Sequence, residues 1–414
     1  MNNYDLIIIG AGAAGLTAAI AFLRGGSYAG KRGSVLLIDA NGEPGKKLLA
    51  TGNGRCNLSN ASAGGWRDTK EFFESLGLLL YEGEGGRVYP QSRQAATVRN
   101  ALVGEAVRLG AEFLANVRAT GVSRSGAGFV VEAERNGEAV ALSGGARRAK
   151  PSVQASREAP MGFSSEQVIV ATGGKACPAY GNFGDGYAIA RSFGIEVSPI
   201  RPALAPFVYA DDVKGGLAAL AGVRAKARVE LLMRRNGNGG GQRSSECGVI
   251  ASAEGEVQFA AYGLSGICVF DLSRHYTGGD GCAVRIDLAP RHTEREIAEL
   301  LASDRAAGLA GIVNSKIAEH IEAKASDAET AAVLVKRLIV PVKGTKGWKD
   351  AQITAGGVSM GEVAPGSYEA AKASGLYFVG EALDYDGASG GYNLDFAWNS
   401  GLKAGRAAAK HLTK

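Results

Sequence analysis

The feature that most constrains the fold of this chain is a glycine-rich turn that directly follows an apolar strand. Residues 4–15 read YDLIIIGAGAAG, in which Gly10, Gly12 and Gly15 have GxGxxG spacing. In a βαβ unit the first glycine permits the tight turn, the second lets a pyrophosphate approach the backbone, and the third lets helix and strand pack closely. The N-terminus of the following helix directs free N–H groups toward the phosphates. The pattern predicts a dinucleotide-binding fold of the Rossmann type.

A second apolar run in the same region ends at an acid. Residues 35–38 are followed by Asp39, a carboxylate that can accept hydrogen bonds from ribose hydroxyls. Asp39 comes a little later after the turn than the usual roughly 20 residues, because residues 25–33 lengthen the crossover. An acid here favours an unphosphorylated ribose, as in FAD or NAD, over NADP.

The stretch after this acid is dense in glycine and polar groups. Residues 44–60 read PGKKLLATGNGRCNLSN, and Lys46, Arg55 and Asn57 are donors that suit a pyrophosphate or a flavin ring. Cys56 has no partner cysteine nearby, so we expect it to pack rather than to act in redox chemistry.

Two further motifs point to a flavin rather than to another dinucleotide. A strand at residues 167–170 enters the turn 171–174, ATGG, which is typical of flavoproteins with a Rossmann core. The apolar run 375–379 ends in Gly380-Glu381, and the glycine loop 387–391 opens the last helix. A helix N-terminus aimed at the flavin would stabilise the anionic reduced ring.

Catalytic groups are less well marked. Arg87 and Tyr89 lie in a polar turn, GRVYPQS, and Tyr392 follows the last glycine loop. Each could polarise a carbonyl oxygen as a hydride arrives. A plain surface turn explains Arg87 and Tyr89 equally well. Asp384 is a further candidate for the same reason of position.

Together these motifs resemble one family. GAGAAG, GKKLLATGNGRCNLSN, GRVYPQS, ATGGKACPAYGNFGDG, ITAGGVSMGEV and GLYFVGEALDYDGASGGYNLDFAWNSG are similar to the FAD-binding flavoproteins that include aminoacetone oxidase and bile-acid 3-oxo reductase-type proteins. The resemblance implies FAD-binding, β-barrel-like and helical domains. It also implies cofactor contacts at Gly10, Gly12, Ala13, Ala14, Gly15, Asp39, Lys46, Arg55, Cys56, Asn57, Val117, Ala171, Thr172, Gly173, Gly380, Glu381, Asn393 and Leu394.

The expected fold class is α/β, with a Rossmann-like FAD-binding domain split between the two ends of the chain and with inserted β-barrel-like and helical domains. The predicted ranges are 1–195 and 356–414 for the FAD domain, 196–290 and 339–355 for the β domain, and 291–338 for the helical part.

Several local predictions accompany this division of the chain. A hairpin is expected across Asn136-Gly137, an insertion at 143–165 and a hairpin tip at 236–241. Capping boxes at Thr293/Glu296 and Ser326/Glu329 predict the starts of two helices.

Composition excludes several classes of function. The formal net charge of +5 is spread along the chain, and its basic stretches are short and lack aromatics, so we expect no nucleic-acid partner. Five cysteines without CxxC spacing indicate a reducing cytoplasm, and four histidines without HxH or HExxH spacing indicate that no metal is bound. The apolar run 6–23 has no basic n-region and contains the phosphate turn, so we expect neither a signal peptide nor a membrane span.

The sequence therefore predicts an FAD-dependent oxidoreductase that transfers a hydride between flavin N5 and a small organic substrate. Two versions stay open. In one, NAD(P)H docks transiently and the enzyme reduces a ketone or enone; in the other, an amine such as aminoacetone is oxidised and O2 accepts the electrons. The alternative from another class is an FAD-dependent tRNA-modifying protein or a flavin-binding module.

Overall fold

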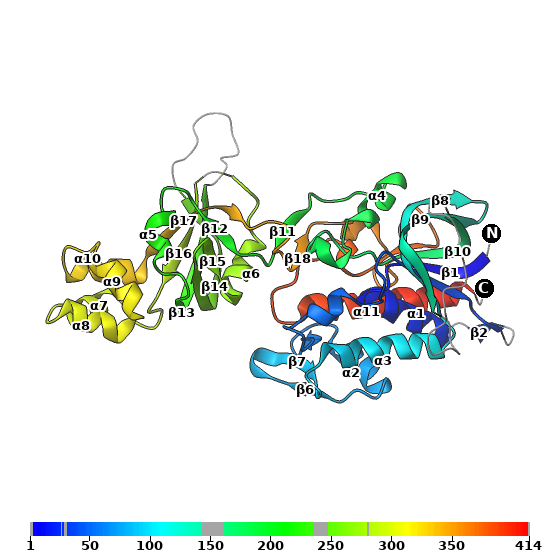
Figure 1. Ribbon diagram of the computed structural model, residues 1–414, viewed down its shortest axis with the longest axis horizontal. Coiled ribbons are helices and arrows are strands. Elements are labelled where there is room, and N and C mark those ends of the chain that lie inside the picture. The colour runs from blue at the N-terminus through cyan, green and yellow to red at the C-terminus, as the bar shows by residue number, and fades with distance from the viewer. Residues whose placement is uncertain are drawn as a thin grey trace. The chain divides into compact units, whose positions relative to one another are not determined.

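The computed structural model describes residues 3–25, 27–28, 31–142, 161–234, 247–279 and 281–412. The chain forms two compact units (Figure 1): unit 1 comprises Met1–Ile200 and Ile353–Lys414, and unit 2 comprises Arg201–Gln352. Most of the predicted insertion at 143–165 and all of the predicted hairpin tip at 236–241 lie outside the described residues.

Unit 1 is built on a six-stranded sheet. Its order is β1 (Asn3–Ile9), β4 (Val35–Asp39), β8 (Glu112–Ser125), β9 (Gly128–Leu142), β10 (Met161–Val170) and β19 (Leu376–Phe378), and β1 also pairs with β10. The pairs β1–β4, β1–β10, β4–β8 and β10–β19 are parallel, whereas β9 is antiparallel to both of its neighbours. Leu6 to Ile9 are all buried, as expected for a parallel strand covered on both faces.

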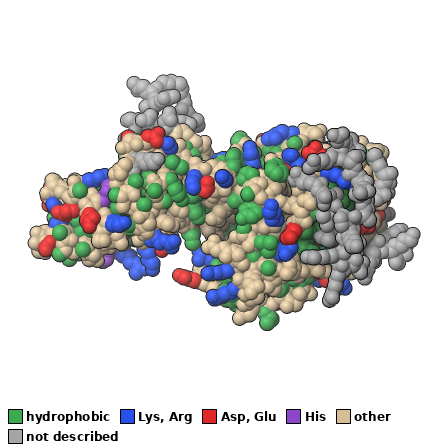
Figure 2. Space-filling view, viewed as in Figure 1, with side chains coloured by type: hydrophobic (Ala, Val, Ile, Leu, Met, Phe, Trp, Pro, Cys, Tyr) green, Lys and Arg blue, Asp and Glu red, His purple; other side chains and the backbone are tan. Residues whose placement is uncertain are grey.

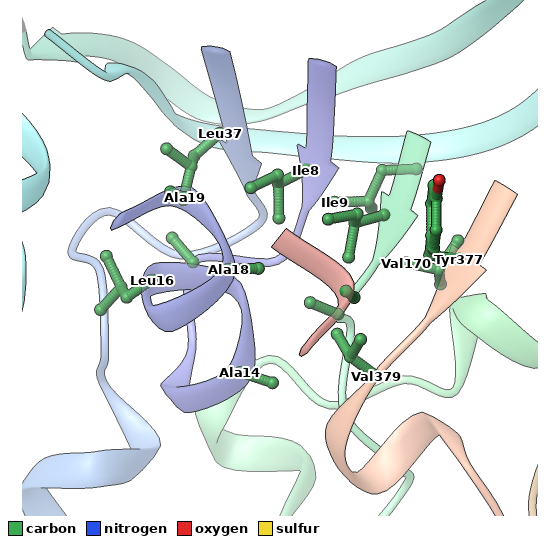
Figure 3. Close-up of a cluster of buried hydrophobic side chains, with 14 of the residues drawn as sticks. Ile8, Ile9, Ala14, Leu16, Ala18, Ala19, Leu37, Val170, Tyr377 and Val379 are labelled. Carbon is green, nitrogen blue, oxygen red and sulfur yellow. The ribbon is translucent and has the colours of Figure 1, made fainter. Parts of the chain in front are cut away.

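Two helices from opposite ends of the sequence cover this sheet. α1 (Ala13–Gly25) and α11 (Tyr392–His411) pack so closely that a Cβ on Gly401 would lie 2.3 Å from the Ala14 carbonyl oxygen, and one on Gly405 2.3 Å from that of Ala18. Figure 3 shows Ala19 of α1 beside Leu37 of β4, with Ile8 on β1 and with Val170 and Tyr377 on the neighbouring strands. This core confirms the predicted Rossmann-type fold assembled from both chain ends.

Among its described residues, unit 1 also contains a small second sheet, three further helices, several short strands and five short 3-10 helices. A small sheet has the order β5 (Ser59–Asn60), β7 (Arg87–Pro90) and β6 (Leu80–Glu82). The other helices and strands are α2 (Trp66–Ser75), α3 (Ala95–Arg108), α4 (Asp185–Ser192), β2 (Ser27–Tyr28), β3 (Lys31–Arg32) and β18 (Ile353–Ala355). Short 3-10 helices are η1 (Lys47–Ala50), η2 (Glu84–Gly86), η3 (Pro178–Tyr180), η4 (Met360–Glu362) and η5 (Gly380–Ala382).

Unit 2 contains the predicted barrel and the predicted helical part. The closed barrel is formed by β12 (Phe207–Tyr209), β15 (Gly263–Ser265), β14 (Cys247–Ala260), β13 (Arg224–Arg234), β16 (Cys282–Asp287) and β17 (Leu338–Thr345). The strand β11 (Arg201–Ala203) and the helices α5 (Lys214–Ala218) and α6 (Ile267–Ser273) complete this part. The helical part consists of α7 (Glu294–Leu301), α8 (Arg305–Ile312), α9 (Ser315–Glu322) and α10 (Ala328–Lys336). On the face shown in Figure 2, acidic and basic side chains lie interspersed on these four helices.

Three local predictions need correction. Gly128–Leu142 is one continuous strand without a hairpin at Asn136-Gly137, because β8 is long enough to pair with both halves of β9 and a register shift between Ala115 and Val117 absorbs the extra residues. The strand before the second glycine turn starts at Met161, so 161–165 belong to β10 rather than to a loop. The helix expected to begin at Ser326 is instead capped by Asp327, whose side chain accepts from the Thr330 N–H. The capping box at Thr293 is confirmed.

Neither a membrane-spanning helix nor a metal cluster occurs among the described residues. No helix there is long and apolar enough to cross a bilayer. No group of three or more His, Cys, Asp or Glu side chains within the same ranges could hold a metal ion.

Candidate functional site

The three glycines of the first turn have different surroundings. Gly10 has a φ of +103°, and a Cβ there would lie 2.3 Å from the Ala171 carbonyl oxygen. A Cβ on Gly15 would lie 1.9 Å from the Gly10 carbonyl oxygen, so both positions require glycine for backbone packing. A Cβ on Gly12 would meet no atom within 4 Å. Gly12 therefore faces open space beside the N-terminus of α1, which leaves room for a phosphate group to approach.

Asp39 braces this turn from the end of β4. Its carboxylate accepts hydrogen bonds from the Ala11 N–H at 2.7 Å, the Asn41 N–H at 2.7 Å and the Asn41 side-chain amide at 3.1 Å. The same amide donates to the Tyr180 carbonyl oxygen, which lies in the segment after the second glycine turn. Burial raises the pKa of Asp39 above its ordinary value. The acid predicted from its spacing thus sits directly against the first turn.

The two consecutive lysines after Asp39 bind different partners. The Lys46 ammonium donates to the Ala179 carbonyl oxygen at 3.2 Å, whereas Lys47 forms an ion pair with Glu381 at 2.8 Å. Lys46 is the lysine predicted to contact the cofactor, whereas Lys47 was not predicted, because two adjacent lysines give no signal in the sequence of which one forms the ion pair.

The loop 51–57 has a backbone conformation that favours glycine. Gly52, Asn53, Gly54 and Cys56 all have φ between +54° and +81°, a region that L side chains rarely adopt. The buried Cys56 is held there by its N–H, which donates to the Thr51 carbonyl oxygen. Burial raises the pKa of the Cys56 thiol to about 12, which agrees with the packing role expected from the sequence.

At the end of this loop, the side chains of Asn57 and Arg55 differ in their burial. The Asn57 Oδ1 atom is buried and has no hydrogen-bond partner within the part of the chain that the structure describes. A buried acceptor of this kind needs a donor, and a flavin nucleotide offers several N–H and O–H groups. The Arg55 side chain is exposed. The space beside Gly12 and the unmet acceptor on Asn57 both fit FAD.

The second glycine turn is locked to the C-terminal motif through Thr354. A Cβ on Gly174 would lie 2.3 Å from Thr354 Oγ1, which accepts from the Lys175 and Ala176 N–H groups. The Thr354 N–H donates to Glu381 Oε1 at 2.9 Å. The Glu381 carboxylate therefore binds Thr354 through one oxygen and Lys47 through the other, so it connects η5 with β18 and η1.

The loop before α11 is held in place by Asn393, the second residue of that helix. The Asn393 side-chain amide donates to the carbonyl oxygens of Gly387 and Ala388 and accepts from the Gly387 N–H. Because its side chain is engaged, Asn393 is left to contact a cofactor mainly through its backbone. Gly391 has a φ of +109°, and a Cβ there would lie 2.3 Å from the Ser59 carbonyl oxygen, so this loop packs tightly on β5.

The other predicted cofactor contacts occupy varied places. Ala13 is the first residue of α1, and Leu394 lies in the first turn of α11. Gly173 has a φ of +71°, Ala171 is buried, and Thr172 lies between them. The remaining members of this set are buried: Ala14, Val117 and Gly380.

Two of the three predicted catalytic residues, Arg87 and Tyr392, lie near Asn60. Arg87 is the register partner of Asn60 in the β5–β7 pair, and the Asn60 amide donates to the Gly390 carbonyl oxygen at 3.2 Å. The Tyr392 hydroxyl lies 2.7 Å from Ser62 Oγ. Tyr89 is two residues further along β7, and its ring stacks on Tyr81 with centroids 5.7 Å apart. The structure thus brings Arg87 and Tyr392 to one hub and gives Tyr89 a packing partner.

The structure contains a buried carboxylate, Asp395, that could not be picked out from the sequence. Asp395, 4% exposed in the first turn of α11, accepts from Ser59 Oγ and Thr69 Oγ1, both at 2.7 Å, and from the Gly65 N–H at 3.2 Å. Burial raises its pKa. One turn later, the Asn399 amide donates to Thr69 Oγ1 and to the Gly65 carbonyl oxygen. This network fastens α11 to the segment that carries β5 and α2.

Comparison with known proteins gives consistent relatives. A family model described as the HI0933-like protein Rossmann domain matches residues 140–407. The chain is 36% identical to a 3-dehydro-bile acid delta(4,6)-reductase of Clostridium scindens, over 97% of this chain and 98% of that protein. It is 30% identical to a ribosomal RNA dihydrouridine synthase of Haemophilus influenzae, over 97% of both. The open conformation of a flavocytochrome c3 fumarate reductase matches with a TM-score of 0.49 and 16% identity, over 100% of this chain and 79% of that one.

Proposed function

This chain belongs to the HI0933-like family with a Rossmann domain, and from that premise we propose that it reduces a carbon–carbon double bond conjugated with a carbonyl group. The coarser part of the prediction is confirmed: the protein is an FAD-dependent oxidoreductase. The class of bond, the substrate and the use of NAD(P)H as electron donor belong to the proposal.

The names of the two relatives support a common chemistry. A 3-dehydro, delta(4,6) bile acid has a ketone conjugated with two ring double bonds. Dihydrouridine is uridine in which the double bond conjugated with a ring carbonyl has been reduced. Both reactions add a hydride to an electron-poor carbon of the conjugated system, β to the carbonyl or, through the second double bond of the diene, δ to it, and a proton to the neighbouring carbon. The observation that carries the proposal is the 36% identity to the reductase over nearly the whole chain.

The residues around the first turn fit the cofactor that such a reaction needs. FAD, when bound, supplies the hydride chemistry. Gly12 and the N-terminus of α1 would hold its pyrophosphate, Asp39 its ribose, and Asn57 a donor of the ring or ribityl chain. We expect the substrate to be a small molecule. NAD(P)H would dock transiently, since the chain has one GxGxxG motif and that motif serves FAD.

An anaerobic stopped-flow experiment tests the proposal. Bleaching of the bound flavin by NADH or NADPH, followed by reoxidation by a 3-oxo-4,6-diene bile acid, is the expected result. Bleaching by aminoacetone without NAD(P)H would favour the amine oxidase and contradict the reductase. Reoxidation by unmodified ribosomal RNA, but not by the diene, would favour the RNA-modifying alternative, which the identity to the dihydrouridine synthase supports.

A matched pair of variants controls for the role of FAD. Gly12→Ala places its methyl group in open space, so the protein should fold and lose at least about tenfold in FAD affinity. Gly15→Ala places the same methyl group 1.9 Å from the Gly10 carbonyl oxygen, so it should lose stability as well as FAD. Retention of FAD by Gly12→Ala would contradict the proposed cofactor position.

A further inference from the structure

We infer that Tyr392 accepts a hydrogen bond from the ligand, because Asn60 and Ser62 together hold its hydroxyl proton. This inference rests on the proposed function in one respect, namely that the substrate of that reaction would contact Tyr392, one of the predicted catalytic residues. The direction of the hydrogen bonds follows from contacts within the protein alone.

The Asn60 amide can take only one orientation. Asn60 is 3% exposed, and its nitrogen donates to the carbonyl oxygens of Gly85 at 3.0 Å and Gly390 at 3.2 Å. Its oxygen accepts from the Ser62 N–H at 3.0 Å. Carbonyl oxygens cannot donate and a backbone N–H cannot accept, so both sides of the amide require the same assignment.

The orientation of Asn60 determines what Ser62 does. Ser62 Oγ lies 2.7 Å from Asn60 Oδ1, and an amide oxygen only accepts, so the single hydroxyl proton of Ser62 is directed to Asn60. The Tyr392 hydroxyl lies 2.7 Å from the same Ser62 oxygen. Since Ser62 has no second proton to offer, Tyr392 is the donor in that contact. The chain therefore runs from Tyr392 through Ser62 to Asn60.

The Tyr392 oxygen is left with lone pairs and no free proton. It suits an N–H or O–H group of the ligand and does not suit a carbonyl oxygen. Arg87, opposite Asn60 in the β5–β7 pair, carries only donors and suits the carbonyl. The pair selects a conjugated carbonyl compound that also carries a hydrogen-bond donor, such as a ring imide. In this assignment Asn60 and Ser62 are positioning residues.

The hydrogen-bond direction can be read without turnover. In ultraviolet resonance Raman spectra, the tyrosine doublet distinguishes a donating from an accepting hydroxyl. The difference between wild type and Tyr392→Phe should show a donor, Ser62→Ala should remove that signature, and Ser62→Thr should restore it. Tyr89→Phe, in the neighbouring strand, is the control and should leave the signature intact. An acceptor signature in the wild type, or no change in Ser62→Ala, would overturn the inferred direction whether or not the protein is a reductase.

The ligand side is tested with uracil and 3-methyluracil, which differ in one N–H group. Absorbance changes of the bound flavin report their binding. We expect Tyr392→Phe to weaken uracil binding about tenfold, the size of one neutral hydrogen bond, and to leave 3-methyluracil unaffected. Equal affinity of both proteins for uracil, or no binding, would overturn the inferred ligand class. Neither outcome would contradict the reduction of a donor-free enone, which the stopped-flow experiment measures separately.

Discussion

Asp39, which is partly buried, and Asp395, which is buried, are two carboxylates of unit 1 that bind backbone N–H groups in different surroundings. Asp39 accepts from Ala11 and Asn41, which belong to the first βαβ unit and face the cofactor position. Asp395 accepts from Ser59 and Thr69, which belong to a separate segment packed on α11. Neither forms a salt bridge within the described residues.

The difference separates binding from stability. The partners of Asp39 include Ala11, which directly precedes the open space at Gly12, so loss of Asp39 should weaken FAD binding first. The partners of Asp395 are more than 300 residues away in the chain, and they join α11 to the segment that carries β5 and α2. Replacing Asp395 should therefore lower the free energy of unfolding.

The strongest test of this contrast is Asp395→Ala. It leaves two hydroxyl groups and the Gly65 N–H without their acceptor in a buried region, so we expect the free energy of unfolding to fall by about 3 kcal/mol. Urea unfolding of the FAD-free protein measures it. Asp68→Ala, on the exposed face of α2, is the matched control and should change little. A loss below about 1 kcal/mol would show that the network does not fasten α11.

Asp39→Asn should have the opposite balance of effects: it should weaken FAD binding strongly and lower the free energy of unfolding less than Asp395→Ala does. The new amide nitrogen would face an N–H of Ala11 or Asn41, and the ribose would lose its charged acceptor, so FAD affinity should fall about tenfold to a hundredfold. Flavin fluorescence titration measures the affinity. Urea unfolding of the FAD-free variant should show a smaller loss than Asp395→Ala. The reverse ranking would invert the contrast between the two acids.

The dependence of stability on pH sharpens the comparison further. Burial raises the pKa of Asp395, so the folded state binds its proton more tightly than the unfolded state does. The stability that this carboxyl contributes is greatest below its unfolded pKa of about 4 and is lost as the pH rises through its folded pKa. The difference in unfolding free energy between wild type and Asp395→Asn should therefore shrink as the pH rises. A difference that grows with pH would mean that the ionised form is the stabilised one.

The smallest expected effect concerns the buried thiol of Cys56. Burial raises the pKa of Cys56 to about 12, so at pH 8 its thiol stays protonated and should not react with a disulfide reagent in the folded protein. Cys56→Ala should leave the count of reactive thiols unchanged. Replacing Cys247, which is exposed, should lower it. A lower count in Cys56→Ala would restore the redox interpretation.

The parts predicted correctly from sequence have local causes. The strand, the glycines and Asp39 fall within one βαβ unit, and the capping box at Thr293 needs only its own four residues. The hairpin at Asn136-Gly137 was wrong because pairing with β8 overrides a local turn signal. Asp395 and the hub at Asn60 were not found, because Ser59, Thr69 and Gly390 come together only through the packing of α11 on β5. The choice between Lys46 and Lys47 has the same tertiary origin.

The close contact of α1 with α11 also bears on the order in which the protein assembles during its synthesis. Unit 2 is continuous in sequence, so all of its residues are available once Gln352 has been made. β1 and α1 are made first, but α1 can complete its packing only after α11 has been made, because it contacts α11 at Gly401 and Gly405. A ribosome that stops before residue 400 therefore releases a chain whose phosphate-binding turn has no completed support, although most of the protein has already been translated.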